Sequence, residues 1–327
     1  MKSFSKDAYT TSRWSRIRAW FVGLLFISGL IVTVTHFSEI EHFVQLLKQA
    51  EPLWLILALL FQACTYFSVA AVWHQALRFG GLSYPFLSLV PLGVAKLFSD
   101  QAMPSAGMSG TAFFVTALSR RGISTDLCMA AMLVSLVAYY AAYLVMAVTS
   151  ISLLWFYHKL NVWIVSITVV FCLVAVAIPA GTLLLQRSGK KDFPAWLQGI
   201  PALRDLLRTF GEAPVELVRN PALIMSAILL HGAIFVLDSA TLWVMLLAVG
   251  QHVSFWAALP SFMLASIIAT LGPIPLGLGT FETTCVAVLG ILGIPLEAAL
   301  TATLLLRGFT LWLPMLPGLW WAKRELH

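Results

Sequence analysis

The chain has 327 residues, of which 60% are hydrophobic and 10% are charged, and its mean hydropathy is +0.91. This composition excludes an ordinary soluble domain, in which about a quarter of the residues are charged. The formal net charge of +6 does not indicate nucleic-acid binding, because the basic residues gather in a few short segments between apolar runs. We therefore expect an all-α, polytopic integral membrane protein with no nucleic-acid partner.

Apolar runs of membrane-spanning length recur along the chain, and a hydrocarbon core of about 30 Å needs about 20 such residues per helix. In chain order, the sequence predicts six full spans over residues 19–35, 52–77, 126–156, 161–186, 221–248 and 297–321. The first run follows a basic segment, 1–18, as in a signal peptide, but no small-residue cleavage site comes after it. We therefore expect it to remain as a span, and we expect residues 322–327 to form a tail.

The basic residues orient these spans. Five Lys and Arg residues lie in 1–18, six lie in 187–219, and Lys323 and Arg324 follow the last span. Loops on the cytoplasmic side carry such an excess of positive charge. Both termini and a basic amphipathic linker over 187–220 are therefore predicted to be cytoplasmic.

Two segments between spans must return to the side of the membrane from which they enter. Basic residues flank the first segment, 84–119, with Arg78 before it and Arg120 after it, so both of its ends are predicted to lie inside. By the same parity, segment 255–293 enters from the outside and returns there. We interpret both as re-entrant helical hairpins, and the alternative is that each hairpin arm crosses fully. The hairpin interpretation divides the chain into two repeats of inverted topology, 19–156 and 161–321.

Each hairpin contains an elbow rich in proline and glycine. Pro104 in the first and Pro275 in the second are 171 positions apart, and the Gly-Ile pairs that begin at Gly122 and Gly293 repeat this offset. Paired interruptions in the two halves of a membrane protein are typical of a transporter's binding site. A helix is predicted to begin after each elbow, and the free N–H groups of a helix start can hold a phosphate.

Ionisable residues at membrane depth are costly and usually face a cavity or a partner. Arg307 lies near the middle of the last predicted span, and we expect it to be the principal counter-charge for a phosphate, because its planar group binds two oxygens at once. Glu282 is expected to neutralise Arg307 in the empty site or to carry a proton. A purely structural ion pair and a helix-capping role for Glu282 are the alternatives. Asp100 and Asp238 are further candidates for a proton or counter-ion site.

The residues predicted to bind a lipid headgroup lie at the two elbows and in the last span. They are Lys96, Asp100, Gln101, Pro104, Ser105, Gly107, Ser109, Gly110, Gly277, Gly279, Thr280, Glu282 and Arg307.

An enzymatic interpretation competes with transport. The string Gly107-Met-Ser-Gly110 resembles the Gly-x-Ser-Gly pattern of rhomboid serine proteases, which would make Ser109 a nucleophile. Such a serine needs a histidine base, and His231 is the only central candidate. No cysteine pair and no His-Glu-x-x-His string has the spacing of metal ligands. We therefore expect neither an enzyme nor a metal or cofactor site. An intramembrane serine hydrolase and an accessory protein that supports a lipid-modifying enzyme are the alternatives.

Three strings resemble the flippase-like family built on the transmembrane region of lysylphosphatidylglycerol synthetase: residues 103–110, 275–282 and 306–314. The resemblance covers nearly the whole chain, but Leu276 and Phe281 stand where the family's second elbow has glycine and arginine. It implies a lipid flippase of the bacterial inner membrane that moves a polar, phosphate-bearing lipid between leaflets. The expected mechanism is alternating access at a midplane site between the two elbows.

The resemblance also implies partners. It predicts a stand-alone member without the synthetase domain, whose partners are membrane lipids with an anionic or lipid-linked headgroup. A second copy of the chain and a lipid-synthesis enzyme are the candidate protein partners.

Overall fold

The computed structural model describes residues 51–102, 108–187, 215–272 and 274–326. The first predicted span, most of the basic linker and the tip of the first elbow, with Pro104, Ser105 and Gly107, lie outside the described residues. Every described element is a helix, so the all-α prediction is confirmed for this part of the chain.

The first half of the described chain contains two long helices with a pair of short ones between them. In chain order these are α2 (Pro52–Phe79), α3 (Val90–Ala102), α4 (Met108–Arg120) and α5 (Thr125–Phe156), with a 3₁₀ turn, Phe86–Ser88, before α3. Helix α2 begins with proline in its first turn, where the missing N–H costs no hydrogen bond. The turn between α4 and α5 contains Gly122, whose φ of +81° favours glycine.

The second half also contains long helices and a pair of short ones. It contains α6 (Val162–Arg187), α9 (Val215–Arg219), α10 (Pro221–Ala248), α11 (Phe255–Leu271), a 3₁₀ turn (Pro275–Gly277), α12 (Thr280–Ile291), α13 (Leu296–Arg307), a π-helical segment (Gly308–Trp312) and α14 (Leu313–Leu326). The side chain of Asn220 caps α10 by accepting the amide hydrogens of Ala222 and Leu223.

Five stretches of the described chain are long and apolar enough to cross a membrane, which identifies a multi-pass membrane protein. They are Pro52–Phe79, Thr125–Phe156, Val162–Gly181, Pro221–Ala248 and Leu296–Glu325. The four hairpin helices have 13, 13, 17 and 12 residues. At 1.5 Å per residue, each is about 18–26 Å long, which is shorter than a hydrocarbon core of about 30 Å. The re-entrant interpretation of both pairs stays a prediction.

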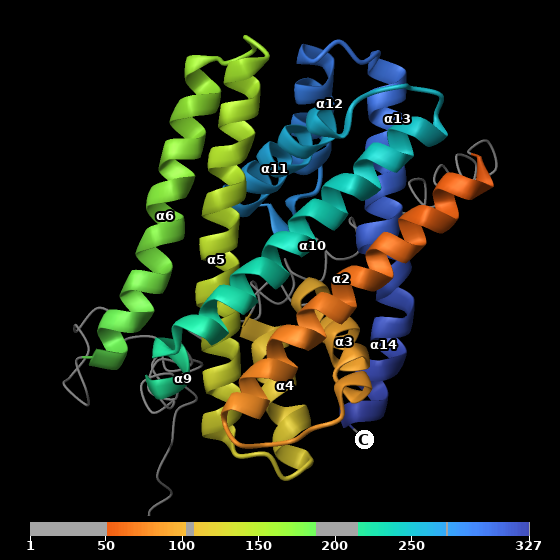
Figure 1. The fold of residues 1–327 in the computed structure, drawn as a ribbon. Helices are drawn as coiled ribbons and strands as arrows, with labels where there is room; N and C mark the ends of the chain where they lie inside the picture. Colours follow the sequence, from red (N-terminus) through yellow and green to blue (C-terminus); the bar gives the residue numbers. More distant parts are fainter. Residues whose placement is uncertain (1–50, 103–107, 188–214, 273, 327) are drawn as a thin grey trace, which may run out of the picture. The chain divides into compact units, whose positions relative to one another are not determined.

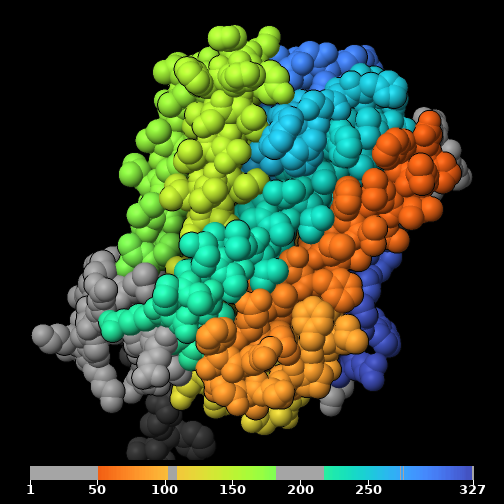
Figure 2. All heavy atoms as spheres, in the orientation of Figure 1, coloured from red at the N-terminus to blue at the C-terminus, as the bar shows by residue number. Residues whose placement is uncertain are grey.

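Helices from the two halves pack directly against each other. Helix α10 lies along α2 and also contacts α5 and α11 (Figure 1). Figure 2 shows α10 crossing the visible face between α2 on one side and α5 and α6 on the other. The two short pairs lie apart in this view, with α3 and α4 toward the bottom and α11 and α12 toward the top. A buried aromatic contact between Trp73 and Phe114, with ring centroids 4.4 Å apart, ties α4 to α2.

The two parts of the last span pack against different hairpins. Helix α13 packs against α12 and α10, whereas α14 packs against α3. A Cβ atom placed on Gly318 would lie 2.7 Å from the Cβ of Phe98, so only glycine permits this close approach. The π-helical segment Gly308–Trp312 joins the two parts, and such segments are frequent at functional sites.

Polar contacts fasten the end of α14 to the first hairpin. The Arg121 guanidinium donates to the hydroxyl of Tyr84 and forms an ion pair with Glu325. Arg120 donates to the main-chain oxygen of Glu325 at 3.3 Å. These contacts hold α14 at the turn between α4 and α5.

Candidate functional site

The second elbow has an unusual backbone that starts α12. Leu276, Gly277 and Gly279 have φ angles of +61°, +63° and +78°, in the left-handed region that favours glycine. A Cβ placed on Gly277 would overlap the Cβ of Ala269 in α11, so the elbow lies directly on that helix. Glu282 closes the helix start, because its Oε2 accepts the amide hydrogen of Gly279 at 2.7 Å. The elbow is therefore a fixed turn.

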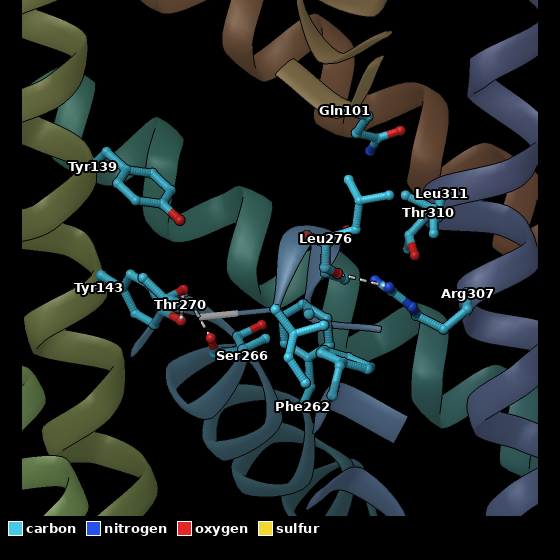
Figure 3. A pocket seen from close by; sticks show the side chains of 15 residues that line it. Gln101, Tyr139, Tyr143, Phe262, Ser266, Thr270, Leu276, Arg307, Thr310 and Leu311 are labelled. Atoms are coloured by element: carbon cyan, nitrogen blue, oxygen red, sulfur yellow. Dashed lines mark hydrogen bonds between the residues drawn. The ribbon is translucent and has the colours of Figure 1, made fainter. Parts of the chain in front are cut away.

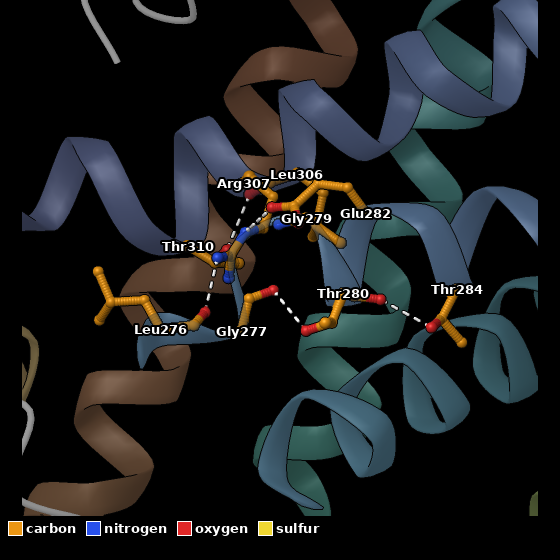
Figure 4. A network of polar contacts seen from close by, with 9 residues as sticks. All are labelled: Leu276, Gly277, Gly279, Thr280, Glu282, Thr284, Leu306, Arg307 and Thr310. Atoms are coloured by element: carbon orange, nitrogen blue, oxygen red, sulfur yellow. Dashed lines mark hydrogen bonds and ion pairs between the residues drawn. The ribbon is translucent and has the colours of Figure 1, made fainter. Parts of the chain in front are cut away.

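Arg307 is held at this elbow by three contacts, and Figure 4 draws those with Glu282 and Leu276. Its Nε donates to Oε1 of Glu282 at 2.6 Å, and its Nη2 donates to the carbonyl oxygen of Leu276 at 2.9 Å. Its guanidinium carbon lies 5.0 Å from the centre of the Phe281 ring. The side chains of Arg307 and Glu282 are only 12% and 17% exposed, so the ion pair is largely shielded from solvent. No described residue accepts a hydrogen bond from Nη1 of Arg307.

Hydroxyl groups of the same elbow bond to the backbone rather than to Arg307. Thr280 Oγ1 donates to the carbonyl of Gly277 at 2.9 Å, and Thr284 Oγ1 donates to the carbonyl of Thr280 at 2.7 Å. The predicted residues Gly277, Gly279, Thr280, Glu282 and Arg307 thus come together in one cluster. Neither threonine caps the helix start, because each hydroxyl donates to a carbonyl oxygen three or four residues earlier.

A cavity of about 330 Å³ opens beside Arg307 (Figure 3). Residues of both halves of the chain form its wall, which combines hydroxyls, aromatic rings and two ionisable groups of opposite sign. The lining residues are Gln101, Tyr139, Tyr143, Asp238, Phe262, Ser266, Ala269, Thr270, Ile274, Leu276, Gly277, Phe281, Arg307, Thr310 and Leu311. A cavity that brings a few polar groups together on an apolar wall is the usual form of a small-ligand site.

Gln101 brings the first hairpin to this cavity. It lies near the end of α3 and shares the wall with Leu276 and Arg307 of the second half (Figure 3). Its Oε1 is buried and has no hydrogen-bond partner among the described residues. A buried acceptor without a partner costs free energy, so this oxygen favours a ligand that donates a hydrogen bond.

Asp238 lines the same cavity from α10. Its Oδ1 accepts a hydrogen bond from Nε2 of Gln62 at 3.0 Å, and the same nitrogen lies 2.9 Å from Oγ1 of Thr241. Gln62 belongs to α2, so this contact also joins the two long helices that pack together. The described part of the chain contains no ion pair that includes Asp238.

A second polar cluster lies in the first hairpin, next to Gln101 along the chain. Lys96 forms an ion pair with Oδ2 of Asp100 at 2.7 Å, and Oδ1 of Asp100 accepts the amide hydrogen of Gly110 at 2.8 Å. The hydroxyl of Ser109 donates to the carbonyl of Ser99 at 2.8 Å. In each hairpin, therefore, one carboxylate joins a cation to the backbone of a helix start.

His231 contacts Ser135 of α5 and not Ser109, the serine that the hydrolase interpretation requires. Its Nε2 is 3.1 Å from the hydroxyl of Ser135, and its ring packs edge to face on Tyr139. These contacts hold α10 against α5. They assign His231 to helix packing, and they give no support to the hydrolase interpretation.

Sequence reasoning missed several residues of the cavity wall. Tyr139 and Tyr143 lie on the apolar helix α5, where such rings normally indicate packing. Gln62 is not part of the wall but donates to Asp238, and it has no local signal at all. The hydroxyl of Tyr143 lies 3.5 Å from Oγ1 of Thr270, which joins α5 to α11. The two tyrosines are four residues apart and therefore lie on one face of α5, and this spacing was the only sequence feature that could have indicated a shared wall.

The described residues contain no group of three or more His, Cys, Asp or Glu side chains that could hold a metal ion. The four cysteines are unpaired thiols within α2, α5, α6 and α12.

Comparison with known families matches residues 20–318 to the lysylphosphatidylglycerol synthase TM region. Comparison with curated proteins finds no match. The family match covers most of the chain, including both hairpins and every residue that lines the cavity.

Proposed function

The chain belongs to the family of the lysylphosphatidylglycerol synthase TM region, and from this premise we propose that it moves a polar, phosphate-bearing lipid between membrane leaflets. The family region is the non-catalytic membrane part of the synthases, so the proposal concerns lipid handling rather than lipid chemistry. We place the protein in the bacterial inner membrane, with both termini in the cytoplasm.

The observation that carries the proposal is the position of Arg307 on the wall of a cavity. An arginine near the centre of a span costs about 3 kcal/mol on insertion scales, so it is expected to have a compensating role. Its charge is balanced by Glu282, and Nη1 is left for a further acceptor. A phosphate oxygen that binds there replaces part of the carboxylate's role. Arginine suits this exchange, because its planar group binds carboxylates and phosphates in the same geometry.

The backbone of the second elbow supports the same ligand. Helix α12 begins at Thr280, and a helix start carries unpaired N–H groups and a partial positive charge. Glu282 occupies this position, where it accepts the amide hydrogen of Gly279. The headgroup and Glu282 therefore compete for the same two positive features, which allows a headgroup to be bound and then released.

The arrangement of the helices supports alternating access. The cavity lies among α3, α5, α10, α11 and the last span, so its wall is shared by both halves of the chain. We propose that one half rocks against the other and exposes the headgroup first to one leaflet and then to the other, with the acyl chains remaining in the bilayer.

A liposome assay tests this proposal. Purified protein is reconstituted into vesicles that contain fluorescent phosphatidylglycerol, and the fraction of label in each leaflet is followed with a membrane-impermeant quencher. We expect lipid exchange above that of empty vesicles for the wild type and for the control Arg78→Leu, which removes an exposed arginine at the end of α2. Arg307→Leu is expected to fold and to lose exchange. Equal exchange by Arg307→Leu and the wild type contradicts the proposed role of Arg307.

A further inference from the structure

We propose that Asp238 takes up a proton when an anionic headgroup binds beside Arg307, so that headgroup and proton occupy the cavity together. The inference rests on the proposed function and adds the coupled ion to it. It follows from the charges that face the cavity and from the partners of each charged group.

The charges around the cavity do not balance. Asp238 and Arg307 are the two lining residues that carry a full charge at neutral pH when ionised. Arg307 is already paired with Glu282 at 2.6 Å, whereas the described partner of Asp238 is the neutral amide of Gln62. With both acids ionised, Asp238, Glu282 and Arg307 together carry one surplus negative charge. Burying an unpaired carboxylate is costly, since the apolar surroundings replace its hydration shell.

An anionic headgroup increases this imbalance. A phosphodiester next to Arg307 would give three negative groups and one positive group within the same region. Like charges in surroundings of low dielectric constant repel strongly, and uptake of one proton removes the repulsion. Glu282 keeps two favourable partners, Arg307 and the amide of Gly279, whereas Asp238 has one neutral donor. Asp238 is therefore the group that takes the proton.

The other titratable groups around Asp238 do not replace it in this role. Helix α2 contributes Tyr66 and α5 contributes Tyr139, both of which interact electrostatically with Asp238 and are neutral near pH 7. Helix α11 carries no titratable side chain. On α10 itself, His231 lies two turns earlier and pairs with Ser135. Lys96 of α3 interacts electrostatically with His231 and is paired with Asp100.

The charged residues of the other helices in contact with α10, α13 and α9, are either paired or distant from Asp238. Helix α13 contributes Arg307, which is paired, and Glu297, which is exposed at the opposite end of that helix. Helix α9 contributes Arg219, which is exposed beside the start of α10 and about five turns from Asp238.

Binding measured against pH tests the inference directly. Wild-type protein in detergent is titrated calorimetrically with dihexanoyl phosphatidylglycerol between pH 5.5 and 8.5, where the phosphodiester stays anionic. We expect the affinity to rise as the pH falls, by up to about tenfold per pH unit where one proton is linked to binding. Asp238→Asn keeps an oxygen for Gln62 and removes the titration, so its affinity is expected to be independent of pH. Asp126→Asn, at the exposed start of α5, is the matched control and should keep the wild-type slope.

Two further arms distinguish a proton that accompanies the anion from a general effect of pH and from a sodium ion. Dihexanoyl phosphatidylcholine, which has no net charge, should bind with a much weaker dependence on pH. Varying Na⁺ at constant pH should leave the binding of phosphatidylglycerol unchanged. The inference is overturned if the wild type shows no slope, if Asp238→Asn keeps the slope, or if Na⁺ replaces the proton.

A transport arm separates this inference from the proposed function. Vesicles that hold a pH-sensitive dye should report proton movement together with phosphatidylglycerol movement, and Asp238→Asn should lose the proton signal. If the wild type moves lipid without protons, the inference fails and the proposed function stands. If it binds lipid with the expected pH slope but never moves lipid, the proposed function fails and proton-linked binding stands.

Discussion

Glu282 has two partners at once, and each belongs to a different role. One carboxylate oxygen accepts the Gly279 amide at the start of α12, and the other accepts from Arg307. Both alternatives considered from the sequence, a helix cap and a partner of Arg307, are therefore present in one side chain. Mutation has to separate the two contributions.

Glu282→Gln is expected to lower transport far more than stability. Glutamine keeps an oxygen for the cap, whose contribution is about 1 kcal/mol, but it removes the counter-charge of Arg307. A bound anion then meets no competitor and leaves more slowly, by about tenfold or more if one charge-assisted hydrogen bond of about 1.5–3 kcal/mol is gained. Lipid exchange in vesicles and thermal unfolding in detergent measure the two effects. Glu297→Gln, an exposed acid in the first turn of α13, is the control. A lower melting temperature with undiminished exchange would leave Glu282 as a cap alone.

Two glycines of the second elbow are expected to differ in how much they tolerate alanine. Gly277 and Gly279 have similar positive φ angles, but a Cβ on Gly277 would overlap Ala269, whereas a Cβ on Gly279 meets no atom within 4 Å. Gly279→Ala should cost about 1–2 kcal/mol for the left-handed backbone alone. Gly277→Ala should cost about 1–3 kcal/mol more, because the overlap forces α11 to move. Chemical unfolding in detergent measures the free energy of unfolding of each variant. Equal losses of stability would mean that α11 moves away from the added methyl group at little cost.

At the scale of single residues, the sequence predicts the ionisable groups better than their neighbours. Arg307, Glu282 and Asp238 stand out because a charge in an apolar run is costly and therefore informative. Tyr143 and Gln62 do not stand out, because the place of Tyr143 on the cavity wall and the contact of Gln62 with Asp238 depend on which helices pack together. Asp100 and Lys96 were expected at the headgroup site, and they form a local pair beside the first helix start.

At the scale of helices, breaks marked by proline and glycine are readable from the sequence. The segment 84–119 contains α3 and α4, and the segment 255–293 contains α11 and α12. The division of the last span after Arg307 was not predicted. The residues Gly308–Trp312 continue an apolar helical pattern, and a π-helical segment depends on packing at both of its ends rather than on local composition.

The packing of α14 on α3 gives a prediction at this scale. Gly318→Ala places a methyl group 2.7 Å from the Cβ of Phe98 and 3.0 Å from the carbonyl oxygen of Val94, so it should destabilise the protein by about 1–3 kcal/mol. Gly290→Ala in α12 is the control, because its Cβ would meet no atom within 4 Å. That change should be neutral or slightly stabilising, since alanine favours a helix. Melting temperatures in detergent compare the two, and a neutral Gly318→Ala would show that the helices separate at little cost.

At the scale of the whole chain, hydropathy predicts helices of spanning length, and the described residues contain five such stretches, but it does not predict how they pack. The directions assigned to the spans from charge stay a prediction. The contact between α2 and α10 joins residues about 176 positions apart, for example Gln62 and Asp238. Both helices are apolar on nearly every side, so neither has a polar stripe from which its packing partner could be predicted. The inverted relation of the two halves rests on charge parity and on the 171-residue offset, and it stays a prediction.

Cysteine labelling tests the orientation of the chain. In a variant without the four native cysteines, Ser124→Cys and His158→Cys place exposed thiols at the two ends of α5. The positive-inside pattern predicts that an impermeant reagent applied to intact cells labels position 158 and not position 124. Labelling at 124 alone would reverse the orientation, and labelling at both positions would show that α5 does not cross.

The π-helical segment also sets the angular phase between the two parts of the last span. Successive residues of an α-helix are rotated by about 100° about its axis, and a π turn holds one residue more than an α turn. If residues 308–312 instead followed regular α-helical winding, the one residue that the wide turn absorbs would rotate α14 by about 100° relative to α13. Gly318 would then face away from Phe98, and bulky side chains would meet α3 in its place. The wide turn thus keeps Arg307 directed at one hairpin while Gly318 is directed at the other.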